Sequence, residues 1–185
     1  LIHSRYRNAQ MPDCRIQFTG FRVCKKDISE VLSEVLSKEE KEVQFEEIKK
    51  IHPKIGFDLL CNEHRYIEKD GQKIALVGVE NWGKSFKQAG DLSKASEGVN
   101  KNDFKILMSH DPSHWEAEVK QDDLNYHLTL SGHTHGLQMG IEIPGWFKWS
   151  PSKYVYKQWA GLYEEYGRYI NVNRGFGYHA FPGRV

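Results

Sequence analysis

The sequence predicts an α/β fold, and three observations carry that prediction. Short apolar runs at residues 104–108 and 128–130 have the composition of buried strands. Each of these runs passes directly into a polar turn that contains histidine. Apolar residues also recur at helical spacing earlier in the chain, so helices are expected beside the strands. At 185 residues the chain is long enough to bury a sizeable core.

The first elements expected are one or two amphipathic helices between residues 28 and 51. Their apolar side chains recur every three or four positions among Glu and Lys, and they are Ile28, Val31, Leu32, Val35, Phe45, Ile48 and Ile51. We expect a break near Ser37 and an end before Pro53, because proline cannot continue a helix. The charged residues between 38 and 50 are expected to form the solvated face.

A β-hairpin and a second group of elements are expected after these helices. Residues 65–68 and 73–79 flank Asp70-Gly71, which is a strong signal for a two-residue hairpin turn. A polar loop with a short helix is expected between residues 84 and 102. After the strand at 104–108, Asp111 can cap a new helix with Pro112 at its first position. A late strand is expected at residues 169–172.

The most informative stretch is Gly132-His133-Thr134-His135-Gly136, which directly follows the strand at 128–130. A turn bounded by glycines can spread two imidazoles around one metal or divide them between two adjacent metals. His110 also lies just after a strand, at 104–108. Because functional sites in α/β proteins form where strands end, three histidines are expected to converge. A lone histidine is usually an ordinary surface or core side chain, so no role is assigned to His3, His52, His114, His127 or His179.

At these residues the chain resembles the calcineurin-like metallophosphoesterases. The resemblance is strongest to a bacterial branch that includes UDP-2,3-diacylglucosamine pyrophosphatase-like and membrane-attached phosphoesterases. It covers residues 37–185, which we assign to the C-terminal part of such a domain. The motifs that carry it are Ile106-Leu107-Met108-Ser109-His110-Asp111-Pro112, Thr129-Leu130-Ser131-Gly132-His133-Thr134-His135-Gly136, Val77-Gly78-Val79-Glu80-Asn81-Trp82-Gly83, Lys148-Trp149-Ser150-Pro151, Tyr156-Lys157-Gln158-Trp159-Ala160-Gly161 and Val172-Asn173-Arg174-Gly175-Phe176-Gly177.

The resemblance implies a two-sheet sandwich flanked by helices, with a binuclear metal site between the sheets. It implies that His110 and His133 bind one divalent ion and that His135 binds the other. The ions would be manganese, zinc or iron. The implied activity is hydrolysis of a phosphomonoester, phosphodiester or pyrophosphate bond by a two-metal mechanism.

The chain also departs from the family pattern. It contains no Asp-x-His and no Gly-Asn-His, and Phe21 stands where the bridging aspartate is expected. Asn62-Glu63-His64 falls where the family has an ordinary strand. We therefore expect that the N-terminal half of the domain is largely missing, that residues 1–36 are a divergent or truncated segment, and that this chain alone is a poor hydrolase. A gene fragment and a degenerate copy both explain the pattern.

Three polar residues around the histidines are considered for secondary roles, and they are Asn81, Asp111 and Arg174. Asp111 is better explained as a helix cap, so Asn81 and Arg174 are the candidates for substrate binding. Arg174, in a glycine-rich loop after a strand, could hold a phosphate with two hydrogen bonds, although a structural arginine explains it equally well. Aromatic residues are abundant after residue 145. We expect them chiefly to pack beneath loops, and the alternative is a wall for a lipid-like or nucleotide substrate.

Composition sets limits on partners. A net charge of +1 with interspersed signs gives no electrostatic case for nucleic acid. The family resemblance implies a phosphorylated small molecule or a lipid-linked phosphate as the substrate. Three cysteines without metal or redox spacing argue against a disulfide framework. The location is left open between the cytoplasm and the periphery of a bacterial membrane, and any N-terminal anchor lies outside this chain.

The function expected from the sequence is therefore that of a metal-dependent phosphoesterase. Two alternatives stay open at this point. The first is a non-catalytic, degenerate relic that keeps the fold, and the second is a structural metal-binding module unrelated to hydrolysis. The missing carboxylates are what separate the enzyme from the relic.

Overall fold

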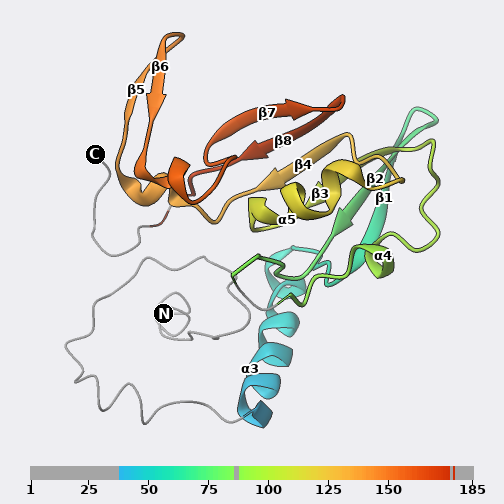
Figure 1. Cartoon of the computed structure of the whole chain (residues 1–185). Coiled ribbons are helices and arrows are strands. Elements are labelled where there is room, and N and C mark those ends of the chain that lie inside the picture. Colours follow the sequence, from blue (N-terminus) through green and yellow to red (C-terminus); the bar gives the residue numbers. More distant parts are fainter. Residues whose placement is uncertain (1–37, 86–87, 176, 178–185) are drawn as a thin grey trace.

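A computed structural model describes residues 38–85, 88–175 and 177. It confirms the α/β class: strands and helices alternate, and six strands form one mixed sheet in the order β1-β2-β3-β4-β8-β7 (Figure 1). The strands of this sheet are β1 (Glu63–Lys69), β2 (Gln72–Gly78), β3 (Phe104–Met108), β4 (Leu128–Ser131), β7 (Gly161–Glu165) and β8 (Arg168–Val172). A separate two-stranded ribbon joins β5 (Ile141–Ile143) and β6 (Phe147–Trp149).

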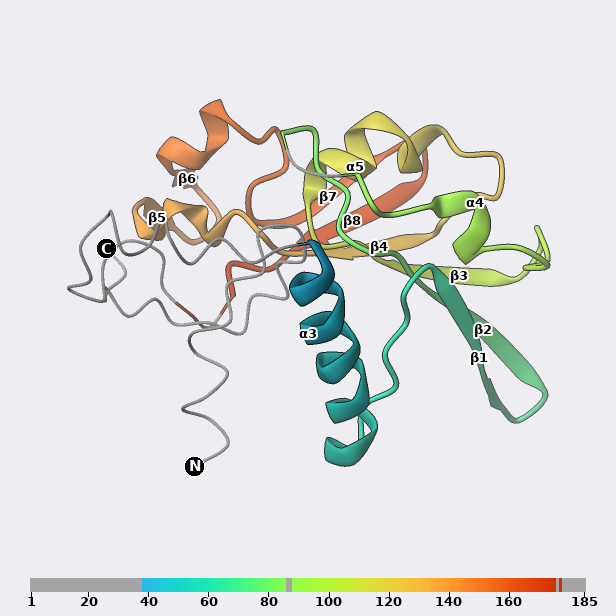
Figure 2. The ribbon, with the colours of Figure 1, turned by 90° about the horizontal axis from the view of Figure 1, so that it is seen from below.

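The helices are short except for the first. They are α3 (Lys38–Ile51), α4 (Leu92–Ala95) and α5 (Pro112–Ala117), with single 3-10 turns η1 (Pro53–Ile55), η2 (Val119–Gln121), η3 (His135–Gln138) and η4 (Pro151–Tyr154). Helices α4 and α5 lie on one side of the sheet, and α3 lies on the other (Figure 2). None of the helices in the described part of the chain has the length and apolarity needed to cross a bilayer.

Most of the elements predicted from the sequence are present. Helix α3 ends before Pro53 as expected, whereas residues 28–35 lie outside the described part. The β1–β2 hairpin turns at Asp70 and Gly71, both with positive φ, which is the geometry of a two-residue turn. Helix α5 begins at Pro112, and the Asp111 side chain accepts a hydrogen bond from the Ser113 amide, so the predicted cap is confirmed.

Four neighbouring strands run parallel, and this brings their carboxyl ends to one edge of the sheet. Strands β2, β3, β4 and β8 are paired in parallel, whereas β1 and β7 run antiparallel at the two outer edges. The pairing of β3 with β4 continues past both strands, because the Ser109 amide donates to Leu130 and the Gly132 amide donates to the His110 carbonyl. The segments that carry His110, His133 and Arg174 therefore leave the sheet side by side.

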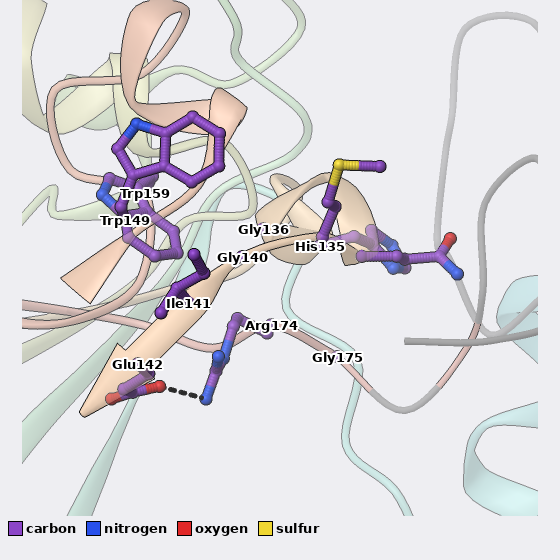
Figure 3. Close-up of a pocket in the computed structure, with 11 residues that line it drawn as sticks. His135, Gly136, Gly140, Ile141, Glu142, Trp149, Trp159, Arg174 and Gly175 are labelled. Carbon is purple, nitrogen blue, oxygen red and sulfur yellow. Dashed lines mark ion pairs between the residues drawn. The ribbon is translucent and has the colours of Figure 1, made fainter. Parts of the chain in front are cut away.

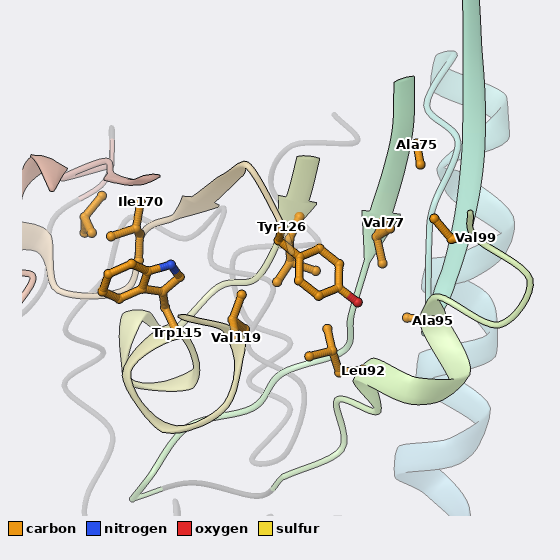
Figure 4. Packing of buried hydrophobic residues seen from close by; sticks show 11 residues of the cluster. Ala75, Val77, Leu92, Ala95, Val99, Trp115, Val119, Tyr126 and Ile170 are labelled. Carbon is orange, nitrogen blue, oxygen red and sulfur yellow. The ribbon is translucent and has the colours of Figure 1, made fainter. Parts of the chain in front are cut away.

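The hydrophobic core lies between the sheet and the α4–α5 layer (Figure 4). Alternate residues of β2, β3 and β8 point into it, and they meet Trp115 and Val119 from the α5 region. Tyr126 is also fully buried, and its hydroxyl donates to the Ser96 hydroxyl at 2.9 Å. This core fixes the strand ends from which the site residues emerge.

The opposite face of the sheet is also apolar, but its side chains are partly exposed. The strand register places on it the side chains of Ile67, Ile74, Phe104, Ile106, Met108, Leu128, Leu130 and Tyr169. Phe104 is 45% exposed and Leu130 is 41% exposed. Within the described residues this face has no second large sheet against it, so the two-sheet sandwich stays a prediction. The predicted boundary at residue 36 likewise falls outside what the structure describes.

Candidate metal centre and adjoining pocket

Two of the three predicted metal ligands lie in direct contact at the carboxyl ends of β3 and β4. The Nε2 atom of His110 lies 3.2 Å from Nδ1 of His133, and the two rings meet edge to face at 86°. His110 is half-buried, and the His133 side chain is only 10% exposed. A separation of 23 residues along the chain is thus closed by the parallel pairing of two neighbouring strands.

This pair of nitrogens suits a shared divalent ion. Imidazole nitrogens bind zinc at about 2.0–2.1 Å, so two ligands of one ion stand roughly 3–3.4 Å apart, and the observed 3.2 Å falls within that range. Across residues 38–85, 88–175 and 177, however, no group of three or more His, Cys, Asp or Glu side chains is arranged to enclose a metal. The pair therefore fits an ion as a partial donor set.

The turn that carries His133 and His135 has an unusual backbone. His133, His135, Leu137 and Gln138 all have positive φ, between 47° and 65°. Residues other than glycine rarely adopt this left-handed backbone conformation, and each one that does so raises the free energy of the folded state by about 1–3 kcal/mol. Strain of this kind persists only where the surroundings impose it, and it concentrates at functional sites. Sequence analysis did not predict a left-handed backbone at these four residues.

Buried hydroxyl groups hold this strained turn in place. The Thr134 hydroxyl donates to the Trp159 carbonyl at 2.7 Å and accepts from the Gly136 amide. The Ser150 hydroxyl donates to the Gly136 carbonyl at 2.6 Å. Because Thr134 and Ser150 are both buried, these hydrogen bonds are shielded from competing water. The turn that carries His133 and His135 is thus held in one conformation by these hydrogen bonds.

His135 lines a pocket of about 330 Å³ (Figure 3). Its ring packs on Gly175, where an added Cβ would lie 3.5 Å from the His135 Cε1 atom. Neither His110 nor His133 is among the residues that line this pocket. The structure therefore joins His110 to His133 and places His135 in an adjoining space, and ligation by all three stays a prediction.

The two predicted substrate-binding residues have different positions. Arg174 lines the pocket with His135, and its Nη2 atom forms an ion pair with Glu142 of β5 at 3.1 Å (Figure 3). Asn81 lies in the segment after β2, where its carbonyl accepts hydrogen bonds from the Ala89 and Gly90 amides. These hydrogen bonds do not bring Asn81 to the histidines. Arg174 is the better placed of the two.

Two contacts of His133 were not found from the sequence. The Asp111 Oδ2 atom lies 3.7 Å from Nε2 of His133, and the Tyr156 ring packs edge to face with His133 at a centroid distance of 5.6 Å. Sequence analysis considered Asp111 for a secondary role around the histidines but favoured helix capping. Its position directly after a candidate ligand was a usable signal. Tyr156 lies in one of the motifs that carry the family resemblance, but no role was assigned to it.

His114 has a structural role, although sequence analysis assigned no role to it. It is completely buried, its Nδ1 atom lies 2.9 Å from the Ser109 hydroxyl, and its Nε2 atom lies 3.2 Å from Glu118. Its ring also stacks on Trp82 at 4.7 Å. Burial lowers the pKa of His114 below its ordinary value, and the nearby Glu118 carboxylate opposes that shift only in part. His114 thus ties α5 to the end of β3.

The aromatic residues of the C-terminal region are divided between the interior and the surface. Trp159 is buried beside the pocket, but Trp146 is 81% exposed and Tyr154 is 74% exposed. The expectation that these aromatics chiefly pack beneath loops is therefore wrong for Trp146 and Tyr154. Trp146 lies in the turn between β5 and β6, a ribbon separate from the six-stranded sheet, so no core surrounds its ring (Figure 1). Tyr154 is the last residue of the short 3-10 turn η4, where its ring is exposed to solvent.

Three curated proteins similar to this chain carry the name metallophosphoesterase. YkuE of Bacillus subtilis, an uncharacterized metallophosphoesterase, is 32% identical over 131 residues, which is 70% of this chain and 43% of the relative. YkoQ of the same organism, also uncharacterized, is 25% identical over 99 residues, 54% of this chain and 34% of the relative. The Caenorhabditis elegans protein F40B5.2 is 32% identical over 92 residues, 46% of this chain and 19% of the relative.

These similarities support the metallophosphoesterase family and suggest a hydrolase that uses divalent metals. The chain spans less than half the length of each of these relatives. No family model matches the chain. No solved structure matches it either.

Proposed function

We propose that this chain contributes one side of a two-metal site that hydrolyses a phosphomonoester, phosphodiester or pyrophosphate bond. The observation that carries the proposal is the 3.2 Å approach of His110 and His133 at the carboxyl ends of adjacent parallel strands. The strained backbone of the turn that carries His133 supports the proposal, because such strain is typical of functional sites. Within the family, we place the chain near the bacterial UDP-2,3-diacylglucosamine pyrophosphatase-like branch on motif resemblance.

In a complete site, with the missing carboxylates supplied, His110 and His133 would hold one divalent ion and His135 would hold the second. Such ions polarise phosphoryl oxygens and lower the pKa of water, which supplies the nucleophile. The identity of the ions, whether manganese, zinc or iron, is left open because imidazole suits all three. The names of the relatives do not favour either a degenerate relic or a purely structural metal module.

Arg174 is the proposed phosphate-binding residue. Its guanidinium has the fork geometry that matches phosphate, and it lies on the same pocket wall as His135. A phosphate entering the pocket would compete with Glu142 for Arg174, because that ion pair is half-exposed on both sides. Glu142 would then keep the guanidinium oriented toward the pocket until substrate binds. Asn81 stays a weaker proposal for the same role.

The remaining pocket wall indicates the kind of group attached to the phosphate. Ile141 and Trp149 pair across the β5–β6 ribbon and line the pocket, with Trp159 beside them (Figure 3). Such a wall suits an apolar or flat group better than a polyhydroxylated one. We therefore propose a phosphorylated small molecule or a lipid-linked phosphate as substrate, bound with its phosphate toward His135 and Arg174.

Zinc binding to the metal-free chain tests the proposed function. We expect saturable binding by equilibrium dialysis, and a loss of affinity of more than about 100-fold in His110→Ala and in His133→Ala, because removal of an outer-shell group alone costs about 10–100-fold. His52→Ala is the matched control, since His52 lies at the end of α3 and contacts the Ile48 carbonyl. Equal zinc binding by all four proteins would contradict the proposal.

A further inference from the structure

We propose that Asp111 is a positioning residue for His133, in addition to capping helix α5. The inference rests on the proposed function, because it assigns Asp111 a task in the metal site. The Asp111 carboxylate faces the ring nitrogen of His133 that is turned away from His110. Its charge fixes which nitrogen carries the proton and so leaves the other available to a metal.

The His133 ring is placed between two partners, one on each nitrogen. Its Nδ1 atom lies 3.2 Å from His110, and its Nε2 atom lies 3.7 Å from Asp111. The side chain of His133 is only 10% exposed, and that of Asp111 is 2% exposed, so little water screens this contact. At 3.7 Å the contact is longer than a hydrogen bond, and it acts through the charge of the carboxylate.

The two oxygens of Asp111 have separate tasks. The Oδ1 atom accepts the Ser113 amide at 2.8 Å and so caps α5. The Oδ2 atom is the one that faces His133. The cap holds the carboxylate in one orientation, because the helix start is anchored by the buried Pro112. Capping therefore explains how Asp111 is held but leaves the direction of Oδ2 unexplained.

The chemistry of a carboxylate supplies the reason for that direction. An ionised carboxylate can only accept hydrogen bonds. Neutral imidazole has one nitrogen that carries a proton and one nitrogen with a free lone pair. A negative charge beside Nε2 favours the tautomer with the proton on Nε2. The Nδ1 lone pair is then directed toward His110 and toward any ion that the pair shares. Carboxylate partners of this kind orient metal-binding histidines and raise their basicity.

The chain offers a matched comparison for separating the two tasks. Asp91 caps α4 as Asp111 caps α5, since its side chain accepts from the Lys94 amide at 2.9 Å. Serine is a good cap residue, so Asp→Ser at either position keeps the cap and removes the charge. We expect both variants to keep their helix caps, and thermal melting checks that each of them folds. Only Asp111→Ser is expected to lower zinc affinity, by about 10–100-fold.

Nitrogen NMR of the histidine rings in the metal-free chain supplies a second readout. His133 in the wild type is expected as the Nε2–H tautomer, and in Asp111→Ser as a mixture. If Asp111→Ser does not fold, Asp111→Asn keeps both the cap and the side-chain shape. Wild-type zinc affinity and an unchanged tautomer in the charge-removing variants would overturn the inference. If the wild type itself binds no zinc, the proposed function fails, and the tautomer measurement still decides the role of Asp111.

Discussion

With manganese or zinc and a generic aryl phosphodiester, this chain is expected to turn over close to the background rate. The sequence contains no Asp-x-His or Gly-Asn-His, and the described residues offer no group of three donors that encloses a metal. Neutral imidazoles without a bridging carboxylate neither hold two divalent cations nor offset their charge. The measurement is release of the aryl alcohol with the metal present and after chelation.

The matched control for this assay is His133→Ala. Any residual hydrolysis that both proteins share comes from free metal or a contaminant, so the two rates are expected to coincide. A metal-dependent rate in the ordinary enzymatic range of about 1–1000 per second that His133→Ala abolishes would show that the site is complete. It would then contradict our expectation for this chain alone.

His114→Ala is expected to destabilise the fold by roughly 2–4 kcal/mol, the range for large-to-small substitutions of fully buried side chains. The substitution removes the ring that stacks on Trp82 and leaves the buried Ser109 hydroxyl without its contact to Nδ1. An unsatisfied buried polar group adds to the cost of the cavity. Urea unfolding, monitored by tryptophan fluorescence, measures the free energy of unfolding.

The same variant tests the pKa direction at His114. Burial lowers its pKa in the folded state from the ordinary value of 6.5, so the unfolded chain binds the proton more readily. The stability contributed by the neutral ring is complete above pH 6.5 and declines as the pH falls toward the folded-state pKa. Loss of this decline in His114→Ala is expected. An unfolding free energy equal to that of the wild type at pH 7 would contradict the structural role.

The elements with strong local signals were predictable from the sequence. Asp70-Gly71 defined the β1–β2 hairpin, Asp111-Pro112 defined the start of α5, and the apolar runs defined β3 and β4. The approach of His110 to His133 followed from placing both after neighbouring strands. In each case the determining interactions are local or follow directly from parallel pairing.

The features that the sequence did not predict depend on tertiary contacts. The left-handed backbone at His133 and His135 is held by the hydrogen bond from the Thr134 hydroxyl to the carbonyl of Trp159, which lies 25 residues away in the sequence. The contact of Asp111 with His133 and the burial of His114 depend on how α5 packs on the sheet. Composition and periodicity contain no information about such long-range packing.

The central claim is that His110 and His133 share one divalent ion. The most direct measurement is anomalous X-ray diffraction at the zinc edge from crystals of the zinc-loaded chain. One strong peak is expected about 2.0–2.1 Å from both His110 Nε2 and His133 Nδ1. A peak at another histidine, such as His64 of β1, would contradict the shared site if His110 and His133 remained in contact with each other without zinc.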